Sequence, residues 1–469
     1  MQNRIKIVTI GGGSSYTPEL IEGLILRQHL LPIAELWLVD IADGAEKMEI
    51  VGNMAKRMIA AAGLDWQVHL TLDRKQALKD ADYVTTQFRV GLLDARLKDE
   101  VIPLACGLLG QETNGAGGLF KAFRTIPVIL EIIDDMRALC PDAWLVDFTN
   151  PAGMVTEAAI KYGKWERTVG LCNVPFGHIT QACKLLETDE SELNFKFAGL
   201  NHFHWHRVWD RAGRERTAEL IDKIYAPEQR EQSDEGLKNI HQIPFHYDQV
   251  KHLGILPCGY HRYYYLQDPM LAHAVEEFAN YETRAEVVKK TERRLFELYK
   301  DVNLNYKPEE LSQRGGAHYS DAACDLIAAI QNNSGKQMVV STRNNGAIAD
   351  LPFDCVVEVT AAITAHGPEP LRWGKLPPAA RGMIQLMKAM EETTIEAAVS
   401  GNYGAALHAF TINPLIPAGD TAIKVLDALL YAHKDYLPKF GDKIAEIERD
   451  KPEIVLFVKE LLADRQAHA

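Results

Sequence analysis

The sequence contains no long apolar run and no recognisable export signal. A membrane-spanning helix needs about 18 or more consecutive apolar residues, and no such run occurs in the 469 residues. The N-terminal stretch MQNRIKIVTIGGG is too short in its apolar part for a signal peptide and lacks a small-residue cleavage pattern. We therefore expect a cytoplasmic protein that does not act at a membrane.

Paired cysteines and clustered positive charge are also missing. The seven cysteines are odd in number, scattered and without a CxxC pair, which favours reduced thiols over a disulfide framework. The formal net charge is −13 and no dense basic segment is present, which argues against nucleic acid as a partner. An anionic small substrate would have to be bound by local arginines against this overall negative field.

The N-terminus carries a strand, a glycine loop and a helix in that order. Ile5–Ile10 is a β-branched run typical of a buried parallel strand, and an apolar-periodic segment begins near Pro18. This context predicts a dinucleotide-binding loop, although the third glycine of the usual pattern is absent; a plain tight turn is the alternative. The loop supplies these candidate cofactor contacts: Gly11, Gly13, Ser14 and Ser15.

A second predicted strand, Glu35–Asp40, ends in an acidic residue. Asp40 lies where the ribose-binding carboxylate of a Rossmann unit is found, and a carboxylate there favours NAD over NADP. The alternative is a surface aspartate that caps a helix beginning near Asp43.

Strands and helices continue to alternate up to about residue 195. Further strands are predicted at Val68–Leu72, Tyr83–Phe88, Ala143–Phe148 and Arg167–Cys172, and helices at Asp43–Ala62, Lys121–Cys140 and Pro151–Tyr162. This alternation predicts an α/β fold with a Rossmann-type, doubly wound parallel sheet over residues 1–195.

The regular alternation of strands and helices ends at about residue 195. We predict that residues 196–469 form an α+β domain that binds substrate and metal and mediates oligomerisation. The expected elements are strand-like Phe195–Trp209, polar loops or helices at 213–250, helical Glu286–Tyr299, antiparallel strands within Met338–Thr364 with a turn at Asn344–Gly346, and helices from Pro377 onward.

Cys172 follows a predicted strand, in Gly170-Leu171-Cys172-Asn173-Val174-Pro175. Open α/β sheets form ligand crevices at the C-terminal ends of their strands, so this thiol is either a small buried side chain or a soft metal ligand. Taken alone, burial is the better interpretation.

Three histidines, His202, His204 and His206, share one face if their segment is a strand. One of them could join Cys172 in an open metal site, but the spacing does not say which. A partly buried polar stripe explains the pattern equally well.

Further candidate residues lie in three places. The segment Leu256–Tyr265 is rich in tyrosine, and a tyrosine acts as a base only if a cation lowers its pKa. The loop Gly110–Gly118 is rich in glycine and polar residues. The arginines Arg96, Arg124 and Arg284 could bind a phosphate, although solvated surface is the default interpretation for each.

Taken together, these residues resemble glycoside hydrolase family four, the NAD- and metal-dependent glycosidases. The likeness covers nearly the whole chain, through VTIGGGSSYTPEL, VGLLDARLKDEVIPL, GQETNGAGG, DFTNPAGMVTEA, GLCNVP, GLNH and LPCGYHRYYY. The resemblance is strongest to the 6-phospho-β-glucosidases, and it implies a fold like that of lactate and malate dehydrogenases.

The resemblance also implies roles for individual residues. Cys172 and His202 match metal ligands, usually for manganese; Tyr260 matches the catalytic base, and Glu112 a carboxylate that tunes it. Arg96, Asn150 and Arg284 match substrate contacts, with the two arginines near the sugar phosphate. Asn173 stands where α-specific members carry an aspartic acid that protonates the leaving group, and an asparagine cannot do so. This difference favours the β-type activity and leaves the leaving-group acid unassigned.

The implied reaction is redox-assisted hydrolysis of 6-phospho-β-glucosides, such as phosphorylated cellobiose-type disaccharides. NAD⁺ oxidises C3, the C2 proton is removed, the C1 group is eliminated, water adds and the sugar is reduced again; the usual carboxylate pair is not needed. The resemblance also implies a homodimer or homotetramer. Alternatives are a 6-phospho-α-glucosidase, an NAD-dependent 2-hydroxy acid dehydrogenase and a non-catalytic nucleotide sensor.

Overall fold

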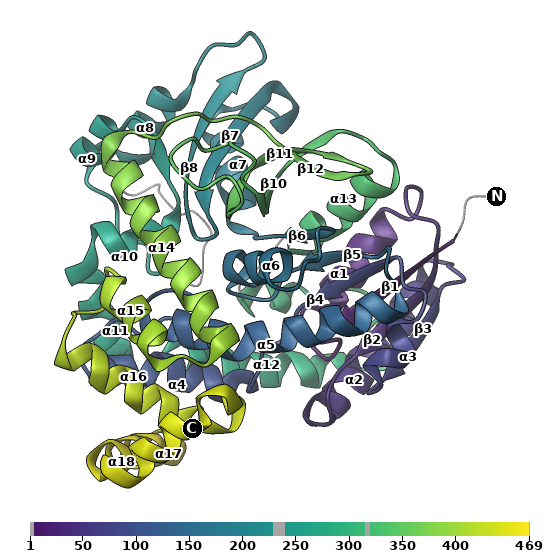
Figure 1. The fold of residues 1–469 in the computed structure, drawn as a ribbon. Coiled ribbons are helices and arrows are strands. Elements are labelled where there is room, and N and C mark those ends of the chain that lie inside the picture. The colour runs from purple at the N-terminus through teal and green to yellow at the C-terminus, as the bar shows by residue number, and fades with distance from the viewer. Residues whose placement is uncertain (1–3, 228–239, 315–318, 469) are drawn as a thin grey trace.

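The computed structural model describes residues 4–227, 240–314 and 319–468. Across these residues one mixed 12-stranded sheet runs through the protein, with helices packed around it (Figure 1). Its strands are β1 (Ile5–Ile10), β2 (Ile33–Val39), β3 (Gln67–Thr71), β4 (Tyr83–Thr86), β5 (Trp144–Asp147), β6 (Thr168–Gly170), β7 (Leu193–Leu200), β8 (Phe203–Asp210), β9 (Leu256–Pro257), β10 (Lys336–Arg343), β11 (Val356–Thr364) and β12 (Gly367–Pro370).

Up to residue 195 the helices are α1 (Thr17–Leu26), α2 (Ala45–Ala61), α3 (Arg74–Leu78), α4 (Leu92–Ala105), α5 (Gly115–Leu139), α6 (Ala152–Lys161) and α7 (Val174–Leu186). After it they are α8 (Thr217–Tyr225), α9 (Tyr247–Leu253), α10 (Arg262–Tyr265), α11 (Gln267–Ala279), α12 (Arg284–Tyr299), α13 (Tyr319–Gln331), α14 (Pro378–Ser400), α15 (Tyr403–Ile412), α16 (Asp420–Ala432), α17 (Gly441–Asp450) and α18 (Pro452–Ala467). Of these later helices, α13 packs against α1, and α12 packs against α2 and α4. Within the described ranges, no helix is both long and apolar enough to span a membrane.

The first six strands form a parallel sheet in the order β3-β2-β1-β4-β5-β6. This is the strand order of a Rossmann fold, in which helices cover both faces. The central strands carry fully buried β-branched side chains such as Val8, Val84 and Val146, as expected of parallel strands enclosed on both sides. The predicted doubly wound sheet is confirmed.

The second half continues the same sheet with antiparallel strands. β10 joins β6 through the pair Ser341 and Gly170, and β11, β7, β8 and β9 follow outward from it (Figure 1). The predicted antiparallel pair within Met338–Thr364 is confirmed as β10 and β11, joined by a loop that contains the Asn344–Gly346 turn. The division of the chain at residue 195 stays a prediction, because the sheet passes through both parts.

Helix α5 begins at Gly115, whereas the sequence predicted a start at Lys121. Its first turn consists mainly of glycine because the neighbouring backbone is too close for side chains. A Cβ at Gly117 would lie 2.4 Å from the carbonyl oxygen of Gln111, and one at Gly118 would lie 2.5 Å from the carbonyl carbon of Thr113. The loop that we expected over 110–118 is therefore partly helical.

The strand-like segment predicted at Phe195–Trp209 is a hairpin of two strands, so the condition under which all three histidines would share one strand face is not met. β7 and β8 pair through Leu200 and Phe203, which leaves Asn201 and His202 as the turn. His202 has φ of +61°, a left-handed conformation that histidine adopts more readily than most residues. It is thereby separated from the other two histidines. The predicted polar segment 213–250 contains α8 and α9, and its residues 228–239 lie outside the described part of the chain.

Candidate active site

A cavity of about 700 Å³ opens at the C-terminal ends of β1, β2, β4 and β5. The predicted site residues that line it are Gly11, Gly13, Ser14, Asp40, Arg96, Glu112 and Asn150. Gly11 has φ of +87°, and a Cβ on it would lie 2.8 Å from the backbone of Phe88. Only glycine fits there without moving the main chain.

Asp40 ties this loop to the end of β2. Its carboxylate accepts hydrogen bonds from the backbone N–H of Gly13 at 2.7 Å and of Ile41 at 2.9 Å. Burial raises the pKa of Asp40, and the hydrogen bonds oppose this rise. Ser15 points toward α12 instead, since its Oγ lies 3.5 Å from Oε2 of Glu292.

These residues fit a nicotinamide dinucleotide. The glycine loop brings bare backbone to the cavity wall, and α1 starts directly after it, with Pro18 in its first turn. A helix N-terminus favours the negative charge of a pyrophosphate, and the Asp40 carboxylate lines the cavity where a ribose hydroxyl would bind.

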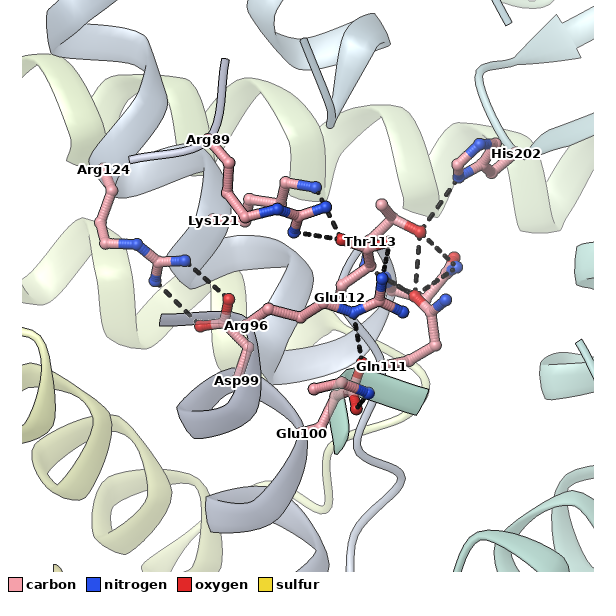
Figure 2. A network of polar contacts seen from close by, with 12 residues as sticks. Arg89, Arg96, Asp99, Glu100, Gln111, Glu112, Thr113, Lys121, Arg124 and His202 are labelled. Atoms are coloured by element: carbon pink, nitrogen blue, oxygen red, sulfur yellow. Dashed lines mark hydrogen bonds and ion pairs between the residues drawn. The ribbon is translucent and has the colours of Figure 1, made fainter. Parts of the chain in front are cut away.

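Three cations converge on the Glu112 carboxylate (Figure 2). Arg89 contacts Oε2, Lys121 Nζ lies 2.9 Å from the same oxygen, and Arg96 Nη1 lies 3.2 Å from Oε1. These charges hold the pKa of Glu112 well below its usual range despite its burial. Burial and the neighbouring Arg89 lower the pKa of Lys121 to about 7.

Arg96 is also close to Arg284 and Arg314, while Glu100 lies 2.7 Å from Arg96 and Glu292 lies 3.5 Å from Arg314. Arg284, the first residue of α12, donates through Nη2 to the carbonyl oxygen of Arg314 at 2.9 Å. Burial lowers the pKa of Arg284, and the charges of Arg96 and Arg314 lower it further. Like charges held this close favour the binding of an anion.

Tyr260, His202 and Cys172 form a separate cluster, which is joined to the cavity through Thr113: this residue follows the cavity-lining Glu112 and contacts His202. The rings of His202 and Tyr260 are stacked, with centroids 3.9 Å apart and an interplanar angle of 6°. Burial raises the pKa of Tyr260 well above 10, and the next largest cause is the nearby Cys172 thiol. All three are buried, with exposed fractions of 6%, 4% and 1% for Tyr260, His202 and Cys172.

Cys172 follows β6 and precedes α7, for which Asn173 is the N-cap. Burial raises the pKa of its thiol well above 9, while hydrogen bonds from the Val174 backbone and the Asn201 side chain oppose this. The predicted position of Cys172 at a strand end is thus the observed one. Asn173 itself is partly exposed.

The pair Cys172 and His202 fits an open metal site. Burial lowers the pKa of His202 to about 3, so its ring is neutral and a ring nitrogen can bind a metal. Among the described residues, no three histidine, cysteine or acidic side chains gather as a complete metal site. A metal here would need further ligands, which substrate oxygens can supply.

The other two histidines have different partners. His204 Nδ1 lies 2.6 Å from Oε1 of Glu358, and the ring of His206 stacks on Phe197 with centroids 4.7 Å apart. Both belong to the interior of β8, whereas the turn carries His202 to Tyr260.

Comparisons with known proteins agree with this geometry. The family 4 glycosyl hydrolase model matches residues 6–188, and the model for the C-terminal domain of that family matches residues 197–416. The chain belongs to the family 4 glycosyl hydrolases. The family that the sequence motifs indicated is thereby confirmed.

Individual members of family 4 match over their full length. The chain is 53% identical to a probable 6-phospho-beta-glucosidase of Bacillus subtilis, over 95% of this chain and 100% of the relative. It is 45% identical to the 6-phospho-beta-glucosidase of Escherichia coli, over 96% and 100%. A crystal structure of the Thermotoga maritima 6-phospho-beta glucosidase with manganese, NAD+ and glucose-6-phosphate aligns with a TM-score of 0.83 at 34% identity, over 92% of this chain and 99% of that one.

Arg124 does not join the family 4 site, contrary to the role considered for it from the sequence. Its guanidinium donates two hydrogen bonds to the Asp99 carboxylate, Nη1–Oδ1 at 2.9 Å and Nη2–Oδ2 at 2.6 Å (Figure 2). Both side chains are buried between α4 and α5. Its charge is therefore used in the packing of the two helices.

Other residues of the site were not predicted. Arg89, Lys121 and Arg314 line the cavity, and Thr113 contacts His202. Thr113 belongs to the motif GQETNGAGG, which signalled the loop but not this side chain. Arg89, Lys121 and Arg314 lie far apart in the chain. The fold brings Arg89 and Lys121 to the Glu112 carboxylate and brings Arg314 to Arg284.

Proposed function

We propose that this chain is a 6-phospho-β-glucosidase that uses NAD⁺ and a divalent metal, with manganese as the expected ion. The observation that carries the proposal is the stacked pair of Tyr260 and His202 beside Cys172, next to a cavity suited to a dinucleotide. Its near-full-length relatives of the same name support the substrate class.

When bound, NAD⁺ would take a hydride from C3 of the sugar and return it at the end, and the metal would polarise the oxidised sugar. Cys172 and His202 would hold that metal. Tyr260 would remove the C2 proton, because a nearby cation is what lowers a phenol pKa enough for this task. The negative charge of Glu112 raises the pKa of Tyr260, which opposes the effect of such a cation and keeps the phenolate basic.

The phosphate would bind at the cationic group of Arg96 and Arg284, and Asn150 would contact the sugar from the cavity wall. Their positive charge offsets the net charge of −13 where an anion has to enter. Asn173, which cannot donate a proton as an aspartic acid does, favours the β-anomer in this proposal.

Two broader expectations belong to the same proposal. The enzyme would act in the cytoplasm, since its charged cofactor and phosphorylated substrate do not cross membranes freely. It would form a homodimer or homotetramer, which light scattering of the purified protein would establish.

The deciding experiment supplies chromogenic 6-phospho-β- and 6-phospho-α-glucosides with NAD⁺ and Mn²⁺. We expect aglycone release from the β-substrate, no net NADH, and loss of turnover after chelation of the metal or removal of NAD⁺. Release only from the α-substrate would contradict the β-assignment. Stoichiometric NADH without aglycone release would point to a dehydrogenase instead.

A further inference from the structure

Thr113 is the residue that connects the cavity to the stacked pair. It directly follows Glu112, and its Oγ1 lies 3.1 Å from Nδ1 of His202 (Figure 2). The same hydroxyl donates to Oε1 of Gln111 at 2.9 Å and also hydrogen-bonds Tyr260.

The acceptor of the Thr113 proton is held in place by several bonds. Oε1 of Gln111 also accepts from the backbone N–H of Thr113 at 2.6 Å and of Asn114 at 2.9 Å. These two N–H donors identify the atom as the amide oxygen, which has no proton to give, so in the 2.9 Å contact the Thr113 hydroxyl is the donor.

A threonine hydroxyl has one proton and can accept through its lone pairs. Since that proton is directed to Gln111, the contact with His202 is made by the hydroxyl accepting from Nδ1–H. A neutral imidazole carries one proton only, so protonation at Nδ1 leaves Nε2 with a free lone pair.

We propose that Thr113 is a positioning residue that fixes His202 in the Nδ1–H tautomer, and thereby presents Nε2 to the divalent metal. This inference rests on the proposed function, because it takes His202 as a metal ligand. Thr113 is not itself a metal ligand in this scheme; it acts on the metal through its hydrogen bond to His202.

The surroundings of His202 give the hydroxyl this influence. The ring is buried, lies flat against Tyr260 and is carried by a residue in the left-handed conformation. Removing the hydroxyl would leave Nδ1–H against an apolar group, a loss that favours the other tautomer or a rotated ring.

The test compares Thr113→Val, which keeps the shape and loses the hydroxyl, with Thr113→Ser, which keeps the hydroxyl. Mn²⁺ affinity of the NAD⁺-bound protein without substrate is measured by calorimetry and by the EPR signal of free Mn²⁺. We expect affinity to fall about 10- to 100-fold in Thr113→Val, as for other residues that orient a ligand, and to stay near that of the unsubstituted protein in Thr113→Ser. The absorption bands of bound Co²⁺ should change in the valine variant and be restored in the serine variant.

Equal Mn²⁺ affinity in folded Thr113→Val and in the unsubstituted protein would overturn the inference. If the Thr113→Val variant fails to fold, Thr113→Ala replaces it. Its Mn²⁺ affinity is then compared with that of Thr113→Ser in the same way. His202→Ala and Cys172→Ser separate this outcome from failure of the proposed site. If those two variants bind Mn²⁺ normally, the metal site is wrong; if they lose it while Thr113→Val keeps it, only the role of Thr113 is wrong.

Discussion

At the scale of single residues, the site depends on where polar groups are buried together. The Glu112 carboxylate lies among Arg89, Arg96 and Lys121, and its negative charge reduces the repulsion between these three cations. Glu100 also pairs with Arg96 at 2.7 Å, so much of this positive charge is compensated. The phenol of Tyr260 lies within reach of the Glu112 charge, which raises its pKa.

Tyr260→Phe tests the proposed base while keeping the ring that stacks on His202. We expect turnover to fall about 10²- to 10⁴-fold, the usual contribution of a general base, and NAD⁺ affinity to stay unchanged. In heavy water the unsubstituted enzyme should place deuterium at C2 of its product, measured by mass spectrometry or NMR. Retention of the original C2 hydrogen by the unsubstituted enzyme would contradict proton abstraction there.

The site residues could be predicted from the sequence only to a limited depth. The spacing of His202, His204 and His206 left three candidates, and the resemblance chose His202. The physical reason is visible only in the fold: the turn at Asn201 and His202 removes one histidine from the strand and turns it toward Tyr260. No sequence pattern announces Thr113 or Lys121, because their partners are set by tertiary proximity.

At the scale of secondary-structure elements, α4 and α5 are joined by a buried ion pair. Asp99 on α4 receives both guanidinium N–H groups of Arg124 on α5, and His433 at the end of α16 lies 2.9 Å from the same carboxylate. Three elements therefore meet at one charge.

Asp99→Asn breaks this pair and leaves Arg124 buried without a counter-charge. We expect a loss of about 3–5 kcal/mol in the free energy of unfolding, measured by urea denaturation. The matched control is Asp94→Asn on the same helix, because Asp94 is 81% exposed where it pairs with Lys289. That change should cost at most about 1 kcal/mol, and equal costs for the two variants would contradict the interpretation.

Gly117 on α5 is a second element-scale test. A methyl group there would lie 2.4 Å from the Gln111 carbonyl oxygen and 2.6 Å from that of Asp99, so Gly117→Ala should lower stability by about 1–3 kcal/mol. Gly382→Ala on α14 meets no atom within 4 Å and should instead raise stability by up to about 1 kcal/mol. Thermal denaturation of both variants should shift in opposite directions; a shift in one direction for both would be inconsistent with this packing.

The elements themselves were largely predictable, and their ends were not. The strand positions of the first half follow from short β-branched runs, but α5 starts six residues before its predicted beginning, since the glycines in its first turn serve close packing. Glycine has a low helix propensity, so propensity alone does not predict a helix that begins in this glycine-rich segment. The close contact with neighbouring backbone outweighs this preference.

At the scale of the whole molecule, buried neutral histidines make stability depend on pH. His433 is fully buried, and burial, followed by the charge of Arg124, lowers its pKa to about 4. In the unfolded chain an imidazole titrates near 6.5. Between these values the unfolded state binds a proton that the folded state does not, so stability falls as pH drops through this window.

His433→Gln removes this one titration and leaves the other ionisable groups in place. We expect the unsubstituted protein to lose about 1 kcal/mol more per pH unit than the variant between about pH 6 and 5. Urea unfolding at equal protein concentrations gives the two slopes. Parallel slopes would show that His433 does not titrate in this way.

The architecture of the first half was predictable from alternating strands and helices, and its Rossmann strand order is confirmed. The extension of the sheet was not predictable, because antiparallel strands far along the chain give no sequence signal of the partner that they will choose. Ser341 lies opposite Gly170 across that extension.

The junction between β6 and β10 limits how the protein can be cut. A fragment ending at residue 195 would expose the outer edge of β6, whose free N–H and C=O groups invite pairing with another copy. We therefore expect such a fragment to aggregate, whatever its affinity for nucleotide. A truncated or chimeric protein that contains only the first half of this enzyme would therefore need an added strand to pair with that edge.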